Sequence, residues 1–272
     1  MINLNGTLIN NLDANLTFEN RAFKYGDALF ETLKITDSKI HFLEDHYFRL
    51  MASMRMLRME IPLNFTMEFF EEEILKTVKA NNLTDSRVRC TVYRVDGGLY
   101  NPASNKIEYL VEAKELILNL KNDYTIELFK DYYVYSGILS TVKTTNKIIN
   151  VLAAIFAEEN ELDNCVLLNE KRNIVEVLNG TIFLVFGNTI KTPAISQGCI
   201  KGIIRKKIIE IILNNTTYTL EETEISPFEL QKADEVFITN AIIGIQPVNF
   251  YKKMVYKTAV SNEIKNMLDK LI

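Results

Sequence analysis

The stretch STVKTTNK, residues 140–147, lies where a strand-like run ends and a long apolar helical pattern begins. Lys143 stands at this junction, and Asn146 follows three residues later. Lysine side chains are mostly exposed in folded proteins, so the position alone does not separate a surface lysine from an amine placed for chemistry. The stretch does show a strand pattern giving way to a helix within eight residues.

Outward from this junction, short strand patterns and helical patterns share the chain. Strands are predicted at 2–4, 7–9, 29–35, 39–42, 87–95, 106–116, 124–135, 164–169, 173–178, 181–192, 218–222 and 235–239. Helices are predicted at about 42–57, 66–80, 145–160, 202–214 and 258–270. Antiparallel hairpins with segregated helices predict an α+β fold of two domains. The polar segment 114–123 places the domains at residues 1–118 and 119–272.

The composition narrows the class of protein. Of the 272 residues, 47% are hydrophobic and 24% are charged, with a net charge of −4, which is typical of globular domains. Nothing resembles the basic face of a nucleic-acid binder, and no apolar run reaches membrane-spanning length. Three widely spaced cysteines (Cys90, Cys165 and Cys199) indicate neither a disulfide framework nor a metal site. We therefore expect a soluble cytoplasmic protein without nucleic-acid, membrane or metal partners.

Two charged residues interrupt apolar strand patterns. Glu176 stands between Val175 and Val177, so it lies either on a solvated strand face or in a partly buried position that needs a cationic partner. Arg94 shares the face of Val88 by the period of two. It either reaches solvent at the strand end or binds a substrate carboxylate.

Two further features are compatible with anion binding. Arg49 follows His46 by one turn of a predicted helix, which indicates either a solvated helix face or a phosphate clamp. Gly198 and Gly202 precede another predicted helix, whose first N–H groups can bind an anion. A lysine, a carboxylate, an arginine and a helix N-terminus are together what pyridoxal 5′-phosphate requires.

Seven motifs then occur in a fixed order. They are FKYGDALFETLKI (23–35), FLEDHYFRL (42–50), RVRCTVYRVDGG (87–98), VKTTN (142–146), VEVLNGTIF (175–183), TP with KGIIR (192–205) and EVFITNAIIGIQPV (235–248). Through them, residues 21–248 resemble the class IV aminotransferase family, the fold-type IV pyridoxal-phosphate enzymes.

This resemblance implies a fold like that of the D-amino acid aminotransferases, a pyridoxal 5′-phosphate cofactor, a small-molecule amine substrate and a homodimer. Lys143 matches the lysine that bonds to the cofactor, Glu176 the acid facing the pyridine nitrogen, and Arg49 the phosphate arginine. The resemblance places Ile203, Ile204, Asn240 and Ala241 among the other cofactor-binding residues, Phe30, Arg94 and Ile242 on the substrate side, and Thr32 as an aid to proton transfer.

The motifs most closely resemble those of the 4-amino-4-deoxychorismate lyases, which make 4-aminobenzoate, a folate precursor, and pyruvate. Ile204 stands where aminotransferases usually have a threonine, and Asn240 and Gly244 follow the lyase pattern. Three positions depart from it: Ala241, Thr181 in place of an asparagine, and Leu99 near the place of a second loop arginine.

Two alternatives stay open. The first is an aminotransferase of branched-chain or D-amino acids, in which Lys143 moves the proton. The second is a non-catalytic relative that binds a ligand on the same fold. Lys147, at the start of the predicted helix, is expected to face water.

Overall fold

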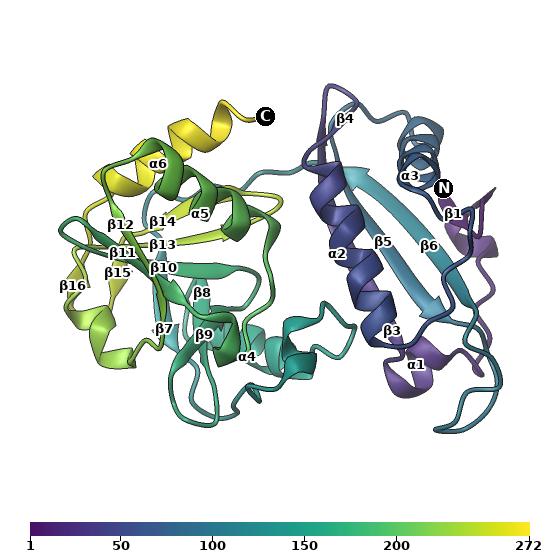
Figure 1. The fold of residues 1–272 in the computed structure, drawn as a ribbon, viewed down its shortest axis with the longest axis horizontal. Helices are drawn as coiled ribbons and strands as arrows, with labels where there is room; N and C mark the ends of the chain where they lie inside the picture. Colours follow the sequence, from purple (N-terminus) through teal and green to yellow (C-terminus); the bar gives the residue numbers. More distant parts are fainter. The chain divides into compact units, whose positions relative to one another are not determined.

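The structure is a computed structural model that describes all 272 residues. It contains six α-helices and three β-sheets, which confirms the predicted α+β class. The chain forms two compact units, one of Met1–Leu118 with Lys143–Asn146 and the other of Asn119–Val142 with Lys147–Ile272 (Figure 1). The prediction had placed 143–146 in the second domain. No helix has the length and apolarity that a membrane span needs.

The first unit is built on a fully antiparallel sheet in the order β2-β1-β6-β5-β3-β4. Its strands are β1 (Ile2–Leu4), β2 (Thr7–Ile9), β3 (Ala28–Thr36), β4 (Lys39–Ile40), β5 (Ser86–Arg94) and β6 (Ile107–Glu115). Its helices are α1 (Arg21–Tyr25), α2 (Leu43–Met56) and α3 (Met67–Ala80).

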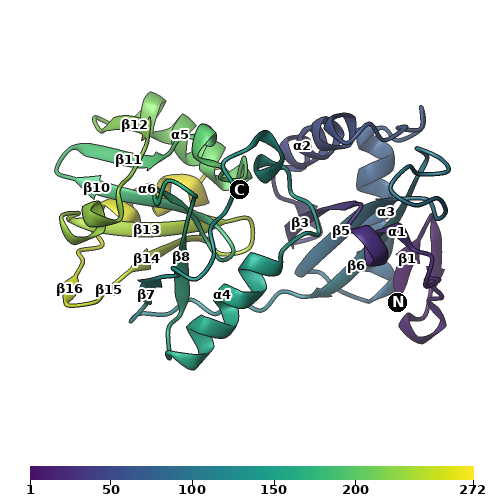
Figure 2. The same ribbon diagram turned by 90° about the horizontal axis from the view of Figure 1, so that it is seen from below.

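Helices α2 and α3 lie side by side on one face of this sheet (Figures 1 and 2). The alternation along β3 decides which residues they cover. Leu29 and Leu33 point to the helices and are buried, whereas Phe30 and Thr32 on the opposite face stay partly exposed. One face of β3 therefore belongs to the core, and the other is available to a ligand.

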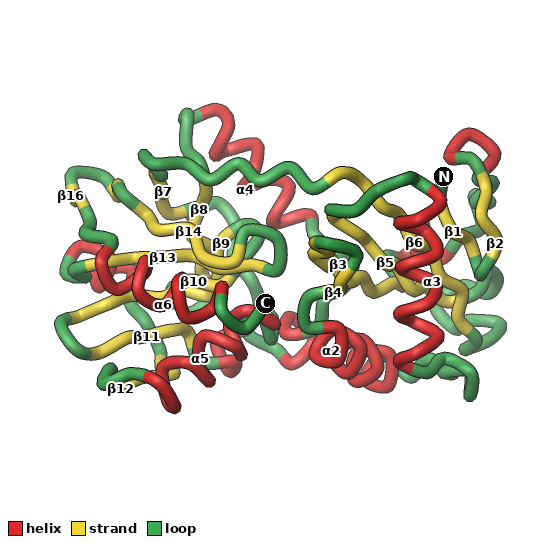
Figure 3. The backbone as a smooth tube through the Cα atoms, turned by 90° about the horizontal axis from the view of Figure 1, so that it is seen from above, coloured by secondary structure: helices red, strands yellow, loops and turns green.

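The second unit contains two five-stranded sheets, in the orders β12-β11-β10-β13-β14 and β16-β15-β7-β8-β9. The strands are β7 (Thr125–Leu128), β8 (Asn164–Leu168), β9 (Ile174–Val177), β10 (Thr181–Phe186), β11 (Thr189–Pro193), β12 (Thr219–Thr223), β13 (Glu235–Asn240), β14 (Gly244–Val248), β15 (Phe250–Tyr251) and β16 (Met254–Val255). The helices are α4 (Ile148–Glu159), α5 (Ile203–Asn215) and α6 (Ala259–Asp269). Helices α5 and α6 pack together, and α6 also packs on β13 and β14 (Figure 3). Apolar side chains from both sheets form a shared core, and a second, smaller cluster lies between β8 and α4.

Several strands of the second unit differ from the prediction. The strand predicted over 181–192 is the hairpin of β10 and β11, and the short strands β15 and β16 were not predicted. The strand predicted over 124–135 ends at Leu128, because Lys130 and Asp131 interrupt the apolar alternation. Strand β14 was not predicted, because Gly244 and Pro247 weaken its pattern. It lies at the edge of its sheet, where a proline that donates no hydrogen bond is tolerated.

A buried carboxylate links β3 to α2. Glu31 lies on the covered face of β3 and is 1% exposed. Its Oε1 accepts a hydrogen bond from Arg49 Nε at 2.7 Å, and its Oε2 accepts one from Arg49 Nη2 at 2.5 Å. His46 Nδ1 also contacts Oε2, at 2.6 Å. The fork of Arg49 is thereby fixed against the sheet.

The protonation states of Glu31 and His46 follow from their burial and from the charges beside them. Burial alone raises the pKa of Glu31, but Arg49 and His46 outweigh it and lower that pKa from 4.5 to about 2. Burial lowers the pKa of His46, although Glu31 acts in the opposite direction. The imidazole is therefore neutral near pH 7. Since an ionised carboxylate can only accept, Nδ1 of His46 is the donor.

Glu31→Gln is expected to destabilise the protein by about 3 kcal/mol at pH 7, because the folded pKa of Glu31 lies below its unfolded value. A depressed carboxyl pKa contributes stability that is fully present above pH 4.5 and is lost as the pH falls through about 2. The difference between the two proteins should therefore shrink over that window. Urea unfolding followed by circular dichroism at several pH values measures it.

Glu72→Gln is the matched control, since Glu72 is exposed on α3 in the same unit. It should unfold like the wild type at every pH. Equal stability of Glu31→Gln and the wild type at pH 7 would contradict a stabilising role for the Glu31 cluster.

Candidate active site

The backbone at Lys143 is bound to the edge of β3. The Phe30 N–H donates to the Lys143 carbonyl at 3.0 Å, and the Thr145 N–H donates to the Ala28 carbonyl at 3.1 Å. Asn146 Nδ2 donates to the Gly26 carbonyl at 3.2 Å. Gly26 is left-handed with φ 62°, and a Cβ there would lie 2.1 Å from Asn146 Oδ1. The short segment therefore extends the sheet and fixes where the Lys143 side chain begins.

The Lys143 amine and one arginine lie against the same aromatic ring. Lys143 Nζ is 4.3 Å from the ring centroid of Phe30, and Arg89 Cζ is 3.8 Å from it. Thr32 pairs with Arg89 across β3 and β5, so both side chains share the Phe30 face of the sheet. The structure thus brings together three predicted residues, Lys143, Phe30 and Thr32. It adds Arg89, which the sequence analysis had not selected.

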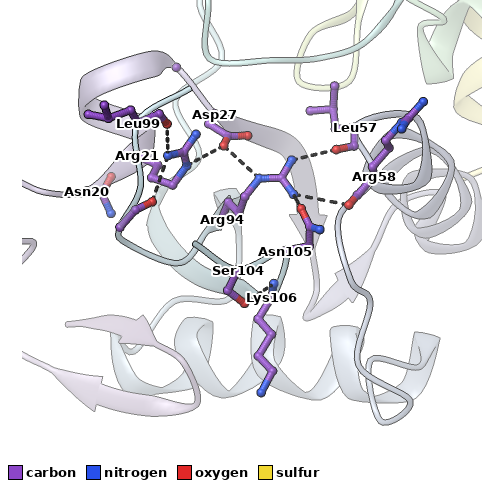
Figure 4. Close-up of polar contacts among 12 residues, drawn as sticks. Asn20, Arg21, Asp27, Leu57, Arg58, Arg94, Leu99, Ser104, Asn105 and Lys106 are labelled. Carbon is purple, nitrogen blue, oxygen red and sulfur yellow. Dashed lines mark hydrogen bonds and ion pairs between the residues drawn. The ribbon is translucent and has the colours of Figure 1, made fainter. Parts of the chain in front are cut away.

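Arg94 is held from several sides (Figure 4). It is 6% exposed, and its Nε donates to Asp27 Oδ2 at 2.9 Å. Its Nη1 donates to Asn105 Oδ1 at 2.6 Å, and its Nη2 donates to the Leu57 carbonyl at 2.7 Å. The Arg58 carbonyl lies 3.4 Å from Nη1. The solvent-exposed alternative for Arg94 is therefore wrong, and this geometry gives no support to a substrate role for it.

The same carboxylate anchors the loop that follows β5 (Figure 4). Asp27 Oδ2 also accepts from Arg21 Nε at 2.9 Å, and Arg21 Nη1 donates to the carbonyls of Gly97 and Leu99 at 3.0 and 2.7 Å. Gly98 is left-handed, and a Cβ there would lie 2.3 Å from the Asn101 carbonyl. The loop lacking the second lyase arginine is thus fixed from inside by Arg21.

Arg89 has the opposite character to Arg94. It is half-buried, its Nε donates to Thr91 Oγ1 at 3.2 Å, and the chain offers its Nη1 and Nη2 groups no hydrogen-bond or ion-pair partner. Burial lowers its pKa, an effect that the charge of Glu112 opposes. The available signal in the sequence was that Arg89 alternates with Val88 and Cys90, which puts it on the other face of β5.

Glu176 lies in β9 and is buried, so the solvated alternative for it is wrong. Its Oε2 accepts a hydrogen bond from the Ile200 N–H at 3.1 Å. Ile200 stands in the turn before α5, and Gly198 in that turn has φ 100°. The Ser136 Cα and Ser140 Oγ would each lie 3.0 Å from a Cβ at Gly198, so this close approach requires glycine.

The N-terminus of α5 has the features of an anion site. Gly202 is its N-cap and no side chain caps it, so the first N–H groups, including those of Ile203 and Ile204, have no partner within the helix. A Cβ at Gly202 would lie 3.1 Å from Thr181 Oγ1, and the Oγ1 of Thr239, opposite Thr181 in the sheet, is buried without a hydrogen bond. These groups fit a phosphate, which binds well at helix N-termini.

The turn between β13 and β14 is stabilised by Asn240. Its Oδ1 accepts from the N–H groups of Ile242 and Ile243, both at 3.0 Å, and Gly244 closes the turn with φ 70°. Both lone pairs of the Asn240 side-chain oxygen are thereby used. The predicted contacts of Asn240, Ala241 and Ile242 with cofactor or substrate stay predictions.

Lys147 differs from its prediction. It does not face water but is half-buried. All three cysteines are free and buried. No group of three His, Cys, Asp or Glu side chains in the chain is placed to hold a metal ion.

Comparison with known proteins identifies the family of the chain. The family model of class IV amino-transferases matches residues 28–250. A protein of Methanocaldococcus jannaschii, provisionally named as a branched-chain-amino-acid aminotransferase, is 31% identical over 251 residues, which are 91% of this chain and 86% of that protein.

Solved structures of two different activities share the fold. The branched-chain aminotransferase of Thermoproteus uzoniensis superposes with a TM-score of 0.91 at 22% identity, covering 99% of this chain and 93% of that one. The 4-amino-4-deoxychorismate lyase of Pseudomonas aeruginosa gives a TM-score of 0.88 at 23% identity, covering 99% and 98%. The chain therefore belongs to the class IV aminotransferase family and is a pyridoxal-phosphate-dependent enzyme.

Proposed function

We propose that this enzyme is a lyase that converts 4-amino-4-deoxychorismate to 4-aminobenzoate and pyruvate. The observation that carries the proposal is the turn after β13, which follows the lyase motif and is held by Asn240. At Ala241 and Ile204, where the aminotransferase motifs have threonine hydroxyls, this chain has apolar side chains. The cofactor phosphate would then depend on Arg49 and on the N–H groups of α5.

Each of the proposed site residues has its own chemical role in this reaction. When bound, pyridoxal phosphate withdraws electrons from the substrate carbon that carries the amine. Lys143 takes the proton from that carbon with its Nζ, and Thr32 helps to protonate the departing enolpyruvyl carbon. Glu176 keeps a negative charge for the pyridine nitrogen, and the Glu31 cluster holds Arg49 for the phosphate. The cleavage conserves all atoms, because the ring product and pyruvate together contain those of the substrate.

We propose Arg89, and not Arg94, as the residue that binds the substrate carboxylate. A substrate carboxylate can pair with the two terminal nitrogens of Arg89, which carry no other partner, whereas Arg94 is committed to Asp27 and backbone carbonyls. Arg89 also shares a face with Phe30 and Lys143, so a carboxylate bound there would lie on the same side of the sheet as the amine.

A second candidate is an aminotransferase of branched-chain or D-amino acids. It is favoured by the 31% identity to the archaeal relative and by the single available guanidinium, which suits a substrate with one recognised carboxylate. In that reaction Lys143 would move the proton from the substrate carbon to the cofactor, and the product would be a keto acid.

Purified enzyme is expected to release equal amounts of 4-aminobenzoate and pyruvate from 4-amino-4-deoxychorismate, measured by chromatography. Lys143→Ala should lower the rate by at least a thousandfold, because it removes the proton-transferring amine. Conversion of the bound cofactor to its pyridoxamine form by L-leucine or D-alanine, without 4-aminobenzoate formation, would identify an aminotransferase. A colourless protein that binds no cofactor would favour the non-catalytic alternative.

Arg89→Leu should raise KM for the substrate by about 10- to 100-fold, because it removes a charge-assisted contact, and it should leave the free energy of unfolding nearly unchanged. Arg94→Leu should instead destabilise the fold, since it removes a buried guanidinium that binds Asp27, Asn105 and the Leu57 carbonyl. Kinetics and urea unfolding of both variants separate the two roles. The opposite pattern would return the substrate role to Arg94.

We further infer that the enzyme is a cytoplasmic homodimer. The exposed side of α4 carries Ile148, Val151 and Ile155 with exposures of 67%, 51% and 47%, an apolar stripe that a partner subunit would cover. Light scattering after size exclusion should give twice 31.3 kDa. Val151→Asp should shift it toward the monomer mass, and Leu213→Asp, at an exposed apolar position on α5, should not. A monomeric wild type would rule out the dimer.

A further inference from the structure

Three cations lie in one row across the first sheet. Arg87 of β5 pairs with Lys34 of β3 on one side and with Lys114 of β6 on the other. Residues that pair directly across strands project from the same face of a sheet, so the three side chains stand next to one another. By the alternation along β3 this is the face of Phe30 and Lys143, opposite to the one that α2 and α3 cover.

The row gathers positive charge without internal compensation. Like charges directly opposite each other on a sheet repel, so the row lowers the stability of the protein without a ligand. The side chains of Arg87 and Lys114 are exposed, and neither makes a hydrogen bond or an ion pair within the chain. The neighbouring row, of Thr32, Arg89 and Glu112, adds one cation and one carboxylate. The two rows thus hold four cations against one carboxylate, in a chain whose net charge is −4.

The spacing of the two rows suits a small molecule with two acidic groups. Successive residues on one face of a strand are about 7 Å apart, which is twice the rise per residue. Arg89 Cζ and Lys143 Nζ lie 3.8 and 4.3 Å from the ring centroid of Phe30. A carboxylate bound by Arg89 would therefore lie between the lysine amine and the row of Arg87, with the second row one step farther from the amine.

We propose that Arg87, with Lys34 and Lys114, is a specificity-determining subsite for a second acidic group of the substrate. The inference rests on the proposed contact of the first carboxylate with Arg89. The proposed substrate, 4-amino-4-deoxychorismate, carries two carboxylates, and the second loop arginine of the lyases is absent near Leu99. The row would supply the second cation from the sheet in place of the loop. The single half-buried guanidinium then no longer favours an aminotransferase of amino acids with one carboxylate.

The alternative is that the row is an ordinary solvated strand end, whose cations meet only water. Hexanoate and adipate distinguish the two explanations, because both have a chain of six carbons and adipate carries one more carboxylate. A subsite in this row makes adipate the tighter ligand. It also makes the difference between the two acids shrink in salt, since the charges of an exposed site are screened. A solvated strand end binds the two acids alike.

The experiment measures the dissociation constants of both acids for the holoenzyme by calorimetry. The wild type should bind adipate about tenfold more tightly than hexanoate in low salt. The ratio should fall to about threefold in Arg87→Gln and to about one in the double variant Arg87→Gln/Lys114→Gln. Lys79→Gln should keep the wild-type ratio, because Lys79 is exposed on α3, on the other side of the sheet. Hexanoate should bind all four proteins alike.

Equal binding of the two acids by the wild type, binding of neither, or an unchanged ratio in Arg87→Gln would overturn the subsite. Arg87→Gln should also raise KM for 4-amino-4-deoxychorismate by about three- to tenfold with kcat unchanged, because the row lies away from the reacting carbon. A protein that makes no 4-aminobenzoate but prefers adipate through Arg87 would lose the lyase assignment and keep the subsite. A lyase whose ratio of the two acids ignores Arg87 would keep the assignment and lose the subsite.

Discussion

The site depends on the pairing of residues 143–145 with the edge of β3, more than 110 positions earlier in the chain. Two backbone hydrogen bonds and the bridge between Leu29 and Thr144 determine where the Lys143 side chain starts. Because β3 alternates, the same strand presents Phe30 to this lysine and Glu31 to α2. A shift of one residue would exchange the two faces and separate the amine from its aromatic partner.

Three arginines of the first unit differ in how their charges are paired. Glu31 holds Arg49 and Asp27 holds Arg94, so both charges are compensated by carboxylates inside the protein. Arg89 has a hydroxyl but no carboxylate within ion-pair distance. A half-buried guanidinium that has no carboxylate partner gains more from binding an anion than a guanidinium that is already paired. That contrast, rather than the number of arginines, supports Arg89 as the substrate contact.

In the second unit, two of the proposed contacts use backbone N–H groups and not side chains. The Ile200 N–H binds Glu176, and the uncapped first turn of α5 offers its amides to an anion. Apolar residues at Ala241 and Ile204 remove two places for hydroxyl contacts. Positive potential at this point would then come from the dipole of α5.

The sequence by itself determined the α+β class, nearly all helices, most strands and, through seven ordered motifs, the family and cofactor. These follow from periodicity and from residue types that are read locally. Only the tertiary structure decided the partners of the charged residues. From the sequence, Arg94 was a candidate for binding a substrate carboxylate, but in the structure Asp27 and the Leu57 carbonyl bind its guanidinium. Arg89 and Glu31 were missed, because the face on which each side chain lies depends on strand register. Lys147 was expected in water, since nothing in a linear sequence shows how much of a helix start the rest of the chain will bury.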